Sequence, residues 1–293
     1  MAGHRHECRC GTPGGARHNA ARSILTKTSG FIAEAGFTHS LTPARNCTFG
    51  CTYCYVPTMG IYGGLKPEDW ERWGQFTTYK SNAAELLRRE VRAGQSIYCS
   101  PLVDPYQPAE ASERMMPRIL DTLIETPPRV FTIQTRGPLI LRDLDRLRAL
   151  SDILTLRVSF SITTNREDVR RLYEPHCASF EERLEVVRAL RDAGIETYAT
   201  LAPLLPCDPE VLARAAIDAT QRDLIGDPLH IRATKRHGAT TREAAFKISS
   251  AHGHDDYLDA LSQRRVVEQI DTFAREAGFT FTTGARGFAR LAL

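Results

Sequence analysis

Residues 46–55 read Asn46-Cys-Thr-Phe-Gly-Cys-Thr-Tyr-Cys-Tyr55, a C-x3-C-x2-C motif formed by Cys47, Cys51 and Cys54. With eight cysteines in 293 residues, chance produces about 0.006 such triplets. Three thiolates on one loop can hold three irons of a cubane cluster and leave the fourth iron open to an exogenous ligand. A structural zinc ion needs four ligands, usually in two pairs, and the chain has no second C-x2-C pair. The motif therefore favours a 4Fe-4S cluster over a zinc site.

Strand-like and helix-like segments alternate on both sides of this motif. The predicted strands are short and rich in β-branched and aromatic residues, and they cover residues 37–43, 96–100, 129–135, 155–162, 195–201 and 229–234. The cysteine motif directly follows the first of them. Repeated alternation implies parallel strands joined by helices, and six units fit an open barrel better than a complete eight-fold one. We therefore predict an α/β fold, a partial (β/α)6 TIM-like barrel of parallel strands with a C-terminal helical and strand extension.

Capping signals predict where several helices begin and end. Asn82 with Glu85, and Ser179 with Glu182, have the spacing of a capping box. Three helices are predicted to end in Ala-Gly, at Gly94, Gly194 and Gly278, because glycine suits the left-handed residue that closes a helix. The domain boundaries follow as a flexible N-terminal tail at 1–22, a barrel domain at 23–240 and an extension at 241–293. The extension contains a helix at about 257–277 and a final stretch at 279–283 that completes or covers the barrel.

Composition and charge restrict the function classes. The chain is 42% hydrophobic and 25% charged, as is usual for a globular protein. No apolar run approaches the roughly 20 residues that span a membrane, and the N-terminus lacks a hydrophobic signal core, so we expect a cytoplasmic protein without a membrane partner. The net charge of +3 is too small to indicate nucleic acid by itself. In the tail, His4, His6, Cys8 and Cys10 could bind a metal ion, although a flexible segment is poorly preorganised for this.

The motif and three further stretches resemble the radical SAM (S-adenosylmethionine) superfamily, and more narrowly its spore photoproduct lyase-like branch, also labelled DNA repair photolyase-like. These stretches are SPLVDPYQPAE at 100–110, IQTRGPLILRD at 133–143, and residues 160–183 continuing to the Ala-Gly at 193–194 and the Ala-Pro at 202–203. The resemblance implies a cluster held by the three cysteines, SAM as second cofactor, and a reducing flavodoxin- or ferredoxin-like electron donor. It also implies cleavage of SAM to methionine and a 5′-deoxyadenosyl radical, which abstracts hydrogen from a substrate.

The resemblance also suggests residues that hold SAM. The positions that match the branch's SAM contacts are Tyr53, Tyr55, Ser100, Arg136 and Ser161. Arg136 replaces a lysine in the branch and keeps the charge with a different geometry. The alternative for the two serines is ordinary hydrogen bonding at strand ends.

Two acidic residues are further candidates. Asp104 and Glu110 lie where the superfamily often binds the SAM amine, but Glu110 could instead belong to the first turn of a helix, where an acidic side chain suits the helix dipole. Glu174 and Arg183 are predicted either to fix the loop beside SAM or to form a surface ion pair worth at most about 1 kcal/mol.

Cys99, at the end of the second predicted strand, is the candidate catalytic residue. Spore photoproduct lyase has a cysteine at a similar position that gives a hydrogen atom to the product radical. The alternative is a small buried residue, since free cysteine is often buried. Cys177 and Cys207 are expected only to pack.

The substrate is less well indicated. The branch implies a DNA lesion, and Arg232, Lys235, Arg236, His237 and Arg242 could grip phosphates or lie on a solvated loop. The C-terminal resemblance is weak, so RNA, peptide and small-molecule substrates stay open. The alternative from another class is a non-catalytic zinc- or iron–sulfur-bound nucleic-acid-binding protein.

Overall fold

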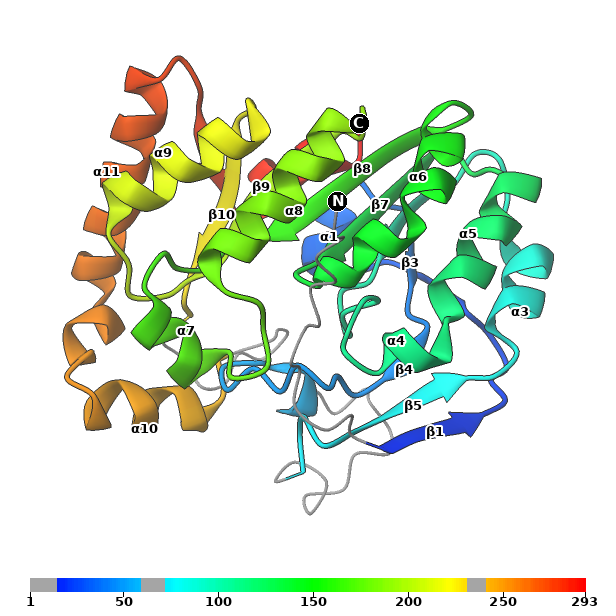
Figure 1. The fold of residues 1–293 in the computed structure, drawn as a ribbon, viewed down its shortest axis with the longest axis horizontal. Coiled ribbons are helices and arrows are strands. Elements are labelled where there is room, and N and C mark those ends of the chain that lie inside the picture. Colours follow the sequence, from blue (N-terminus) through cyan, green and yellow to red (C-terminus); the bar gives the residue numbers. More distant parts are fainter. Residues whose placement is uncertain (1–14, 59–71, 231–240) are drawn as a thin grey trace, which may run out of the picture.

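The fold is built around one large, mostly parallel sheet (Figure 1). The computed structural model describes residues 15–58, 72–230 and 241–293. The sheet has eight strands in the order β11-β10-β9-β8-β7-β6-β3-β2. Their bounds are β2 Leu25–Lys27, β3 His39–Leu41, β6 Ser96–Cys99, β7 Val130–Thr135, β8 Thr155–Ser161, β9 Thr197–Leu204, β10 Leu224–Pro228 and β11 Phe281–Thr283.

All neighbouring strands from β3 to β11 pair in parallel, and only β2 is antiparallel. The end strands β2 and β11 are not paired with each other, so the barrel is open. The predicted partial barrel of parallel strands is therefore confirmed. The stretch predicted at 279–283 supplies β11, which extends the sheet beyond the six predicted units.

Helices α3, α5, α6, α8 and α9 cover one face of this sheet (Figure 1), whereas α1 and the C-terminal segment pack against the other face, where Phe288 and Leu291 contact the cluster of Tyr98, Tyr198 and Ile225. The α-helices are α1 Gly30–Glu34, α3 Ala83–Glu90, α4 Glu110–Glu113, α5 Met115–Glu125, α6 Leu144–Ser151, α7 Glu167–Tyr173, α8 Phe180–Asp192, α9 Pro209–Thr220, α10 Glu243–Ala251, α11 Ala260–Glu276 and α12 Gly284–Phe288. Short 3-10 turns occur at η1 Val56–Thr58, η3 Pro138–Asp143, η4 Asp255–Leu258 and η5 Ala289–Leu291. Among the described residues, no helix combines the length and apolar character that crossing a membrane demands.

The two faces of the sheet differ in chemistry because side chains alternate along each strand. On the outer face, register aligns Cys99 with Ile133 and Ile133 with Val158, and these residues belong to the main core together with the buried residues of α3, α5, α6, α8 and α9. On the inner face, Gln134 of β7 lies beside Ser159 of β8. The inner face thus combines these polar side chains with a small hydrophobic cluster, in which Tyr98, Tyr198 and Ile225 pack with Phe288 and Leu291.

Side chains of the inner face form a continuous hydrogen-bonded row. Gln134 accepts hydrogen bonds from the Tyr98 hydroxyl at 2.6 Å and the Ser159 hydroxyl at 2.6 Å, and it donates to Ser161 Oγ at 2.7 Å. The Ser159 hydroxyl also contacts the Thr200 hydroxyl. The row thus connects four adjacent strands, from β6 to β9.

A second, three-stranded sheet has the order β1-β5-β4, with bounds β1 Gly15–Asn19, β5 Phe76–Lys80 and β4 Ala44–Arg45. β1 lies inside the segment predicted as a flexible tail, and its five residues are all exposed. It forms because its backbone pairs in parallel with β5, which no local hydrophobic pattern could reveal. β4 leads directly into the cysteine motif.

Several predicted boundaries are wrong. A strand at Leu224–Pro228 was missed, because Gly, Asp and Pro within it disguise a buried strand. Of the predicted strand at 229–234, residues 231–234 lie outside the described residues. The Asn82 side chain does not cap α3 but exchanges hydrogen bonds with the backbone of Ala21. Helix α3 also ends at Glu90, before the predicted Gly94.

Other local predictions are confirmed. The capping box of Ser179 and Glu182 is fully formed at the start of α8. Gly194 and Gly278 both have φ of +83° at helix ends. One of the two predicted capping boxes and two of the three predicted Ala-Gly helix ends are thus present.

Candidate functional site

The cysteine motif forms a loop that leaves β4 beside the C-terminal end of β3. Asn46 with φ of 63° and Gly50 with φ of 61° reverse the chain direction. The Gly50 N–H donates to the Cys47 carbonyl at 3.3 Å, and the Cys54 N–H donates to the Cys51 carbonyl at 3.1 Å. Two successive turns therefore carry the three cysteines on one compact loop. Cys47 and Cys51 are buried and Cys54 is partly buried.

Groups from three other segments anchor this loop. The Thr48 N–H donates to Gln107 Oε1 at 2.7 Å. The Thr77 hydroxyl donates to the Asn46 carbonyl at 3.1 Å. The Thr52 N–H donates to the carbonyl of Tyr173, the last residue of α7, at 2.9 Å. The loop is thus held to the main chain and side chains of the body of the protein.

The loop also packs against the chain just before β5. A Cβ atom added at Gly74 would lie only 2.8 Å from the Gly50 Cα, and one added at Gly50 would lie 3.0 Å from the Gly74 Cα. Both glycines have positive φ. Glycine is therefore required at each position by backbone conformation and by the close approach.

Cys51 lies in the most polar surroundings of the three cysteines. Its sulfur lies 3.9 Å from the sulfur of Cys177 and 3.6 Å from a guanidinium nitrogen of Arg136. The hydrogen bond with Cys177 lowers the pKa of Cys51, burial opposes this, and the charge of Arg136 lowers the pKa further. Cys51 is thus the thiol of the motif that is most easily deprotonated, which favours metal binding.

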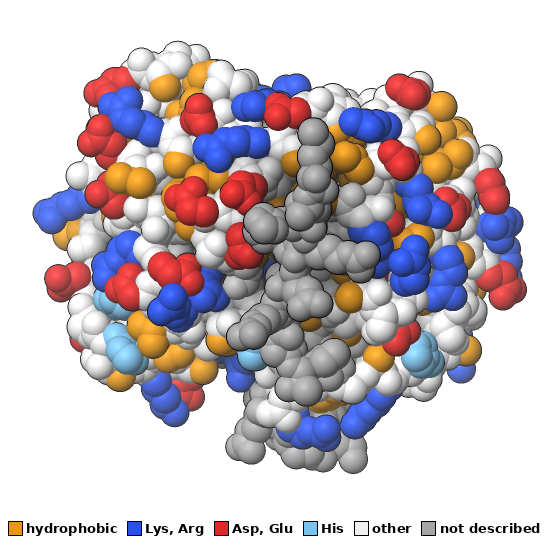
Figure 2. Space-filling model, in the orientation of Figure 1, with side chains coloured by type: hydrophobic (Ala, Val, Ile, Leu, Met, Phe, Trp, Pro, Cys, Tyr) orange, Lys and Arg blue, Asp and Glu red, His pale blue; other side chains and the backbone are white. Residues whose placement is uncertain are grey.

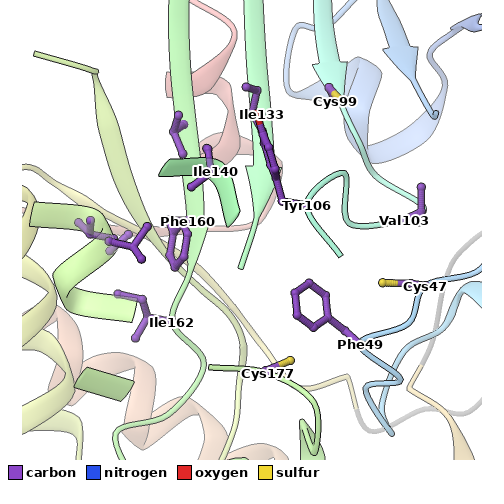
Figure 3. Close-up of a cluster of buried hydrophobic side chains, with 14 of the residues drawn as sticks. Cys47, Phe49, Cys99, Val103, Tyr106, Ile133, Ile140, Phe160, Ile162 and Cys177 are labelled. Carbon is purple, nitrogen blue, oxygen red and sulfur yellow. The ribbon is translucent and has the colours of Figure 1, made fainter. Parts of the chain in front are cut away.

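Burial has the largest effect on the pKa values of the other two thiols, Cys47 and Cys54. It raises the pKa of Cys54 to about 12 and the pKa of Cys47 well above its ordinary value. Metal binding at these thiols would therefore release protons. Figure 3 shows Cys47 and Phe49 of the loop in the same buried cluster as Cys177.

The donor set fits an iron–sulfur cluster in number and kind, because three thiols share one anchored loop. Within the described ranges, no three His, Cys, Asp or Glu side chains are arranged to hold a metal ion. Cluster binding would therefore require the three thiols to turn toward a common centre.

A buried ionic network lies next to the loop. Glu174 is completely buried, and its carboxylate forms ion pairs with Arg136 and Arg183 and accepts a hydrogen bond from the Tyr53 hydroxyl. Burial alone would raise the pKa of Glu174, but the charges of Arg183 and Arg136 outweigh it and hold the pKa at about 2. Arg183 also donates to the backbone carbonyls of Ala178 and Ser161.

This network decides between two predictions for Glu174 and Arg183. The pair is buried, with side chains 0% and 2% exposed, so the alternative of a surface ion pair is wrong. It connects Tyr53 of the cysteine loop to the segment that follows β8. Arg136 and Tyr53, predicted to contact SAM, are both engaged by protein groups in this network.

Asp104 is also engaged by protein groups. Its carboxylate accepts hydrogen bonds from the Thr135 hydroxyl at 2.6 Å, the Arg136 N–H at 2.8 Å and the Tyr106 N–H at 2.9 Å. Burial raises its pKa, and the hydrogen bond from Thr135 opposes the rise. Asp104 thus braces the turns after β6 and β7.

Glu110 opens helix α4, as the helix-dipole alternative predicts. Its buried carboxylate accepts hydrogen bonds from the N–H groups of Met115 and Met116 and pairs with Arg142 at 3.0 Å. Glu110 therefore caps the start of α5.

The remaining predicted SAM contacts lie around the same strand ends. The Ser100 hydroxyl is 3.4 Å from the Thr42 hydroxyl, and Ser161 accepts from Gln134. The Tyr55 hydroxyl donates to the Pro101 carbonyl at 2.8 Å. Both serines are buried.

Cys99 is fully buried, and burial raises the pKa of its thiol. Register places it on the outer face, aligned with Ile133, while Tyr98 lies on the inner face. This placement supports the alternative of a packed core residue.

Sequence reasoning missed two residues that contact the motif, Cys177 and Gln107. Cys177 was expected only to pack, yet its sulfur lies beside that of Cys51. Gln107 holds the loop through Thr48. Both residues lie in stretches that carry the family resemblance, but the sequence does not indicate these contacts, because each joins segments far apart in the chain. Cys207, as expected, lies among core residues, 3.6 Å from the Tyr257 hydroxyl.

Part of the predicted site lies outside the described residues. This holds for Arg232, Lys235, Arg236 and His237, and for the histidines and cysteines of the tail, His4, His6, Cys8 and Cys10. Arg242 is described, and its N–H donates to the carbonyl of Tyr53 at 3.3 Å. Helix α10 therefore begins against the cysteine loop.

Comparison with known proteins gives consistent results. Residues 41–210 match the sequence profile of the Radical SAM superfamily. Uncharacterized protein MJ0683 of Methanocaldococcus jannaschii is 28% identical over 160 residues, covering 55% of this chain and 58% of that protein. Uncharacterized protein Rv2578c of Mycobacterium tuberculosis is 27% identical over 230 residues, covering 73% and 65%. The chain thus spans less than two thirds of the length of these relatives.

Among solved structures, a mutant spore photoproduct lyase with bound AdoMet and dinucleoside spore photoproduct superposes with a TM-score of 0.58. Its sequence identity is 16%, and the match covers 88% of this chain and 80% of that chain. At this identity the likeness shows a shared fold.

Proposed function

Because the chain belongs to the radical SAM superfamily, we propose that it is an enzyme that reductively cleaves S-adenosylmethionine at a 4Fe-4S cluster held by Cys47, Cys51 and Cys54. When bound, the cluster supplies the electron that splits SAM into methionine and a 5′-deoxyadenosyl radical. A reducing, cytoplasmic compartment, which keeps the free thiols available, is part of this proposal.

The observation that carries the proposal is the anchored three-thiol loop at the carboxyl ends of the parallel strands. Sites of parallel α/β barrels lie at this edge. Three cysteines leave one iron of a cubane without a protein ligand, which is where SAM would bind. The buried network of Glu174, Arg136 and Tyr53 holds this loop against the strand ends.

We assign the surrounding residues to SAM binding as part of the proposal. Ser100 and Ser161 lie at the ends of β6 and β8, where their hydroxyls can exchange a protein partner for the cofactor. Tyr53 and Tyr55 flank Cys54, and their rings can contact adenine. Asp104 and Arg136 act mainly by positioning, since their charged groups are already bound by protein groups.

The test is anaerobic iron–sulfide reconstitution followed by addition of SAM and dithionite. We expect a brown protein with about four irons per chain and release of 5′-deoxyadenosine. Alanine variants of the three motif cysteines should lose the iron, whereas the matched Cys207→Ala control should keep it. A colourless protein that binds one zinc ion and leaves SAM intact would support the non-catalytic alternative.

The role of Cys99 as hydrogen-atom donor stays a prediction. A Cys99→Ala variant with an unchanged product distribution would remove that role. If Cys99 only packs, the variant loses stability and keeps its products.

The substrate is proposed only as a class. The likeness to a structure that binds a dinucleoside spore photoproduct makes a nucleic-acid lesion one candidate. RNA, a peptide or a small molecule is the alternative, and product analysis with each class decides. The electron donor that the reaction requires would be a flavodoxin- or ferredoxin-like protein.

A further inference from the structure

The outward face of the small sheet is cationic. In the register, Arg17 of β1 and Arg45 of β4 both pair with Thr78 of β5, so the three side chains lie in one row on the same face. Lys80, two residues after Thr78, is on this face as well. With strands about 4.8 Å apart, the two arginine positions lie roughly 10 Å from each other. We call Arg17, Arg45, Thr78 and Lys80 the basic face.

The two arginines of the basic face are not paired with described carboxylates. Arg17 and Arg45 are exposed, and neither forms an ion pair with a described residue. Burial lowers the pKa of Lys80, and the neighbouring charge of Arg45 lowers it further. The charge of Glu90, whose carboxylate accepts hydrogen bonds from the N–H groups of Ile24 and Leu25, opposes this decrease, and the Lys80 ammonium donates to the Ser23 carbonyl at 3.2 Å. By contrast, the helical side of the molecule intersperses both signs of charge (Figure 2).

One guanidinium group of the face is held in place by an aromatic ring. The Arg17 guanidinium lies 4.7 Å from the ring centroid of Phe76, and the Arg72 guanidinium lies 5.1 Å from it. Both distances are within the range of cation–π contacts. Arg17 is therefore partly preorganised, which reduces the entropy lost when a partner binds.

The basic face lies directly behind the cysteine loop. Arg45 precedes Cys47 by two residues, and the Thr77 hydroxyl bonds to the backbone carbonyls of Arg45 and Asn46. The opposite face of the small sheet carries Thr77 and Tyr79, both buried, and Tyr79 belongs to the main core. A partner on the basic face would thus be separated from the cysteine loop by one layer of sheet.

We propose that the basic face is the docking surface for an acidic one-electron donor protein. This inference rests on the proposed function, because only a cluster in the loop requires an external electron. One electron passes from the donor, which is oxidised, to the cluster, which is reduced. Nucleic acid fits the face less well, since its substrate groups must reach the barrel interior, and the basic face points away from the core. Charge complementarity would raise the association rate and affinity of an acidic partner.

The experiment compares two double variants of the reconstituted protein that carry the same change in net charge. Arg17→Glu/Arg45→Glu reverses the basic face, and Arg264→Glu/Arg265→Glu on α11 is the control. The probe is an acidic flavodoxin, and its Kd is measured by calorimetry at about 20 mM and about 300 mM salt. We expect the basic-face variant to raise Kd at least about tenfold at low salt relative to the control, with the gap closing at high salt. Reduction of the cluster by dithionite, followed by electron paramagnetic resonance, should be the same in both variants.

Other results overturn the inference. Equal Kd values for both variants would exclude the basic face as the docking surface. If dithionite still reduced the cluster in both variants, the proposed function would be unaffected by that result. Loss of oligonucleotide binding with unchanged flavodoxin binding would make it a nucleic-acid surface. A protein that takes up no iron would overturn the proposed function, and the donor surface with it.

Discussion

Glu174→Gln tests the central feature of the site, the buried carboxylate between two arginines. The substitution keeps the size of the side chain and removes its charge. Arg136 and Arg183, with side chains 15% and 2% exposed, then lose their counter-ion inside the protein. Breaking a buried ion pair from one side costs about 3–5 kcal/mol, because the remaining charge stays desolvated.

The pKa of Glu174 gives an independent magnitude. It is held at about 2 in the folded protein against an ordinary value of 4.5. A pKa lowered from 4.5 to about 2 corresponds to about 3 kcal/mol of stability at neutral pH. Because the folded pKa is the lower one, this stability is present above about pH 4.5 and is lost as the pH falls toward 2.

The assay is urea unfolding of the wild type and of Glu174→Gln between pH 3 and pH 7 (values chosen to bracket about 4.5). We expect a loss of about 3–5 kcal/mol at pH 7 and a smaller difference at pH 3. The control is Glu125→Gln, which removes an exposed ion pair to Arg88 and should cost less than about 1 kcal/mol. If the two variants lost equal stability at pH 7, the reasoning from burial would be refuted.

Three further predictions concern the cap of α8, the packing at Gly226 and the pair of thiols Cys51 and Cys177. Ser179→Ala should cost about 1 kcal/mol in urea unfolding because it removes the capping box of α8, and an unchanged midpoint would contradict this. Gly226→Ala should cost about 1–3 kcal/mol, because its Cβ would lie 2.6 Å from a buried ring, whereas Gly94→Ala, with nothing within 4 Å, should not destabilise. In cluster-free protein exposed to oxygen, Cys51 and Cys177 should lose two protons and two electrons to oxygen and form a disulfide, given their 3.9 Å separation. Mass spectrometry of unreduced peptides checks this, and Cys177→Ser should abolish the cross-linked peptide.

Much of the fold could be predicted from the sequence. The five neighbouring strands of the large sheet from β3 to β9 were located, because runs of β-branched and aromatic residues mark most strands of a parallel sheet. β10 was missed because it contains Gly226, a residue unusual in strands. Glycine is present there because the ring of Phe281 occupies the space that a side chain would fill. β1 was missed since its stability comes from pairing with β5 rather than from its own composition.

The sequence by itself determined which thiols share the candidate site, because three cysteines within eight residues lie on one loop whatever the rest of the chain does. Only the tertiary structure decided what surrounds them. It placed Cys177 beside Cys51, buried Glu174 between two arginines and set the basic face behind the loop. Desolvation and long-range charge depend on which distant segments pack together, and that information is spread over the whole chain rather than carried by any one motif.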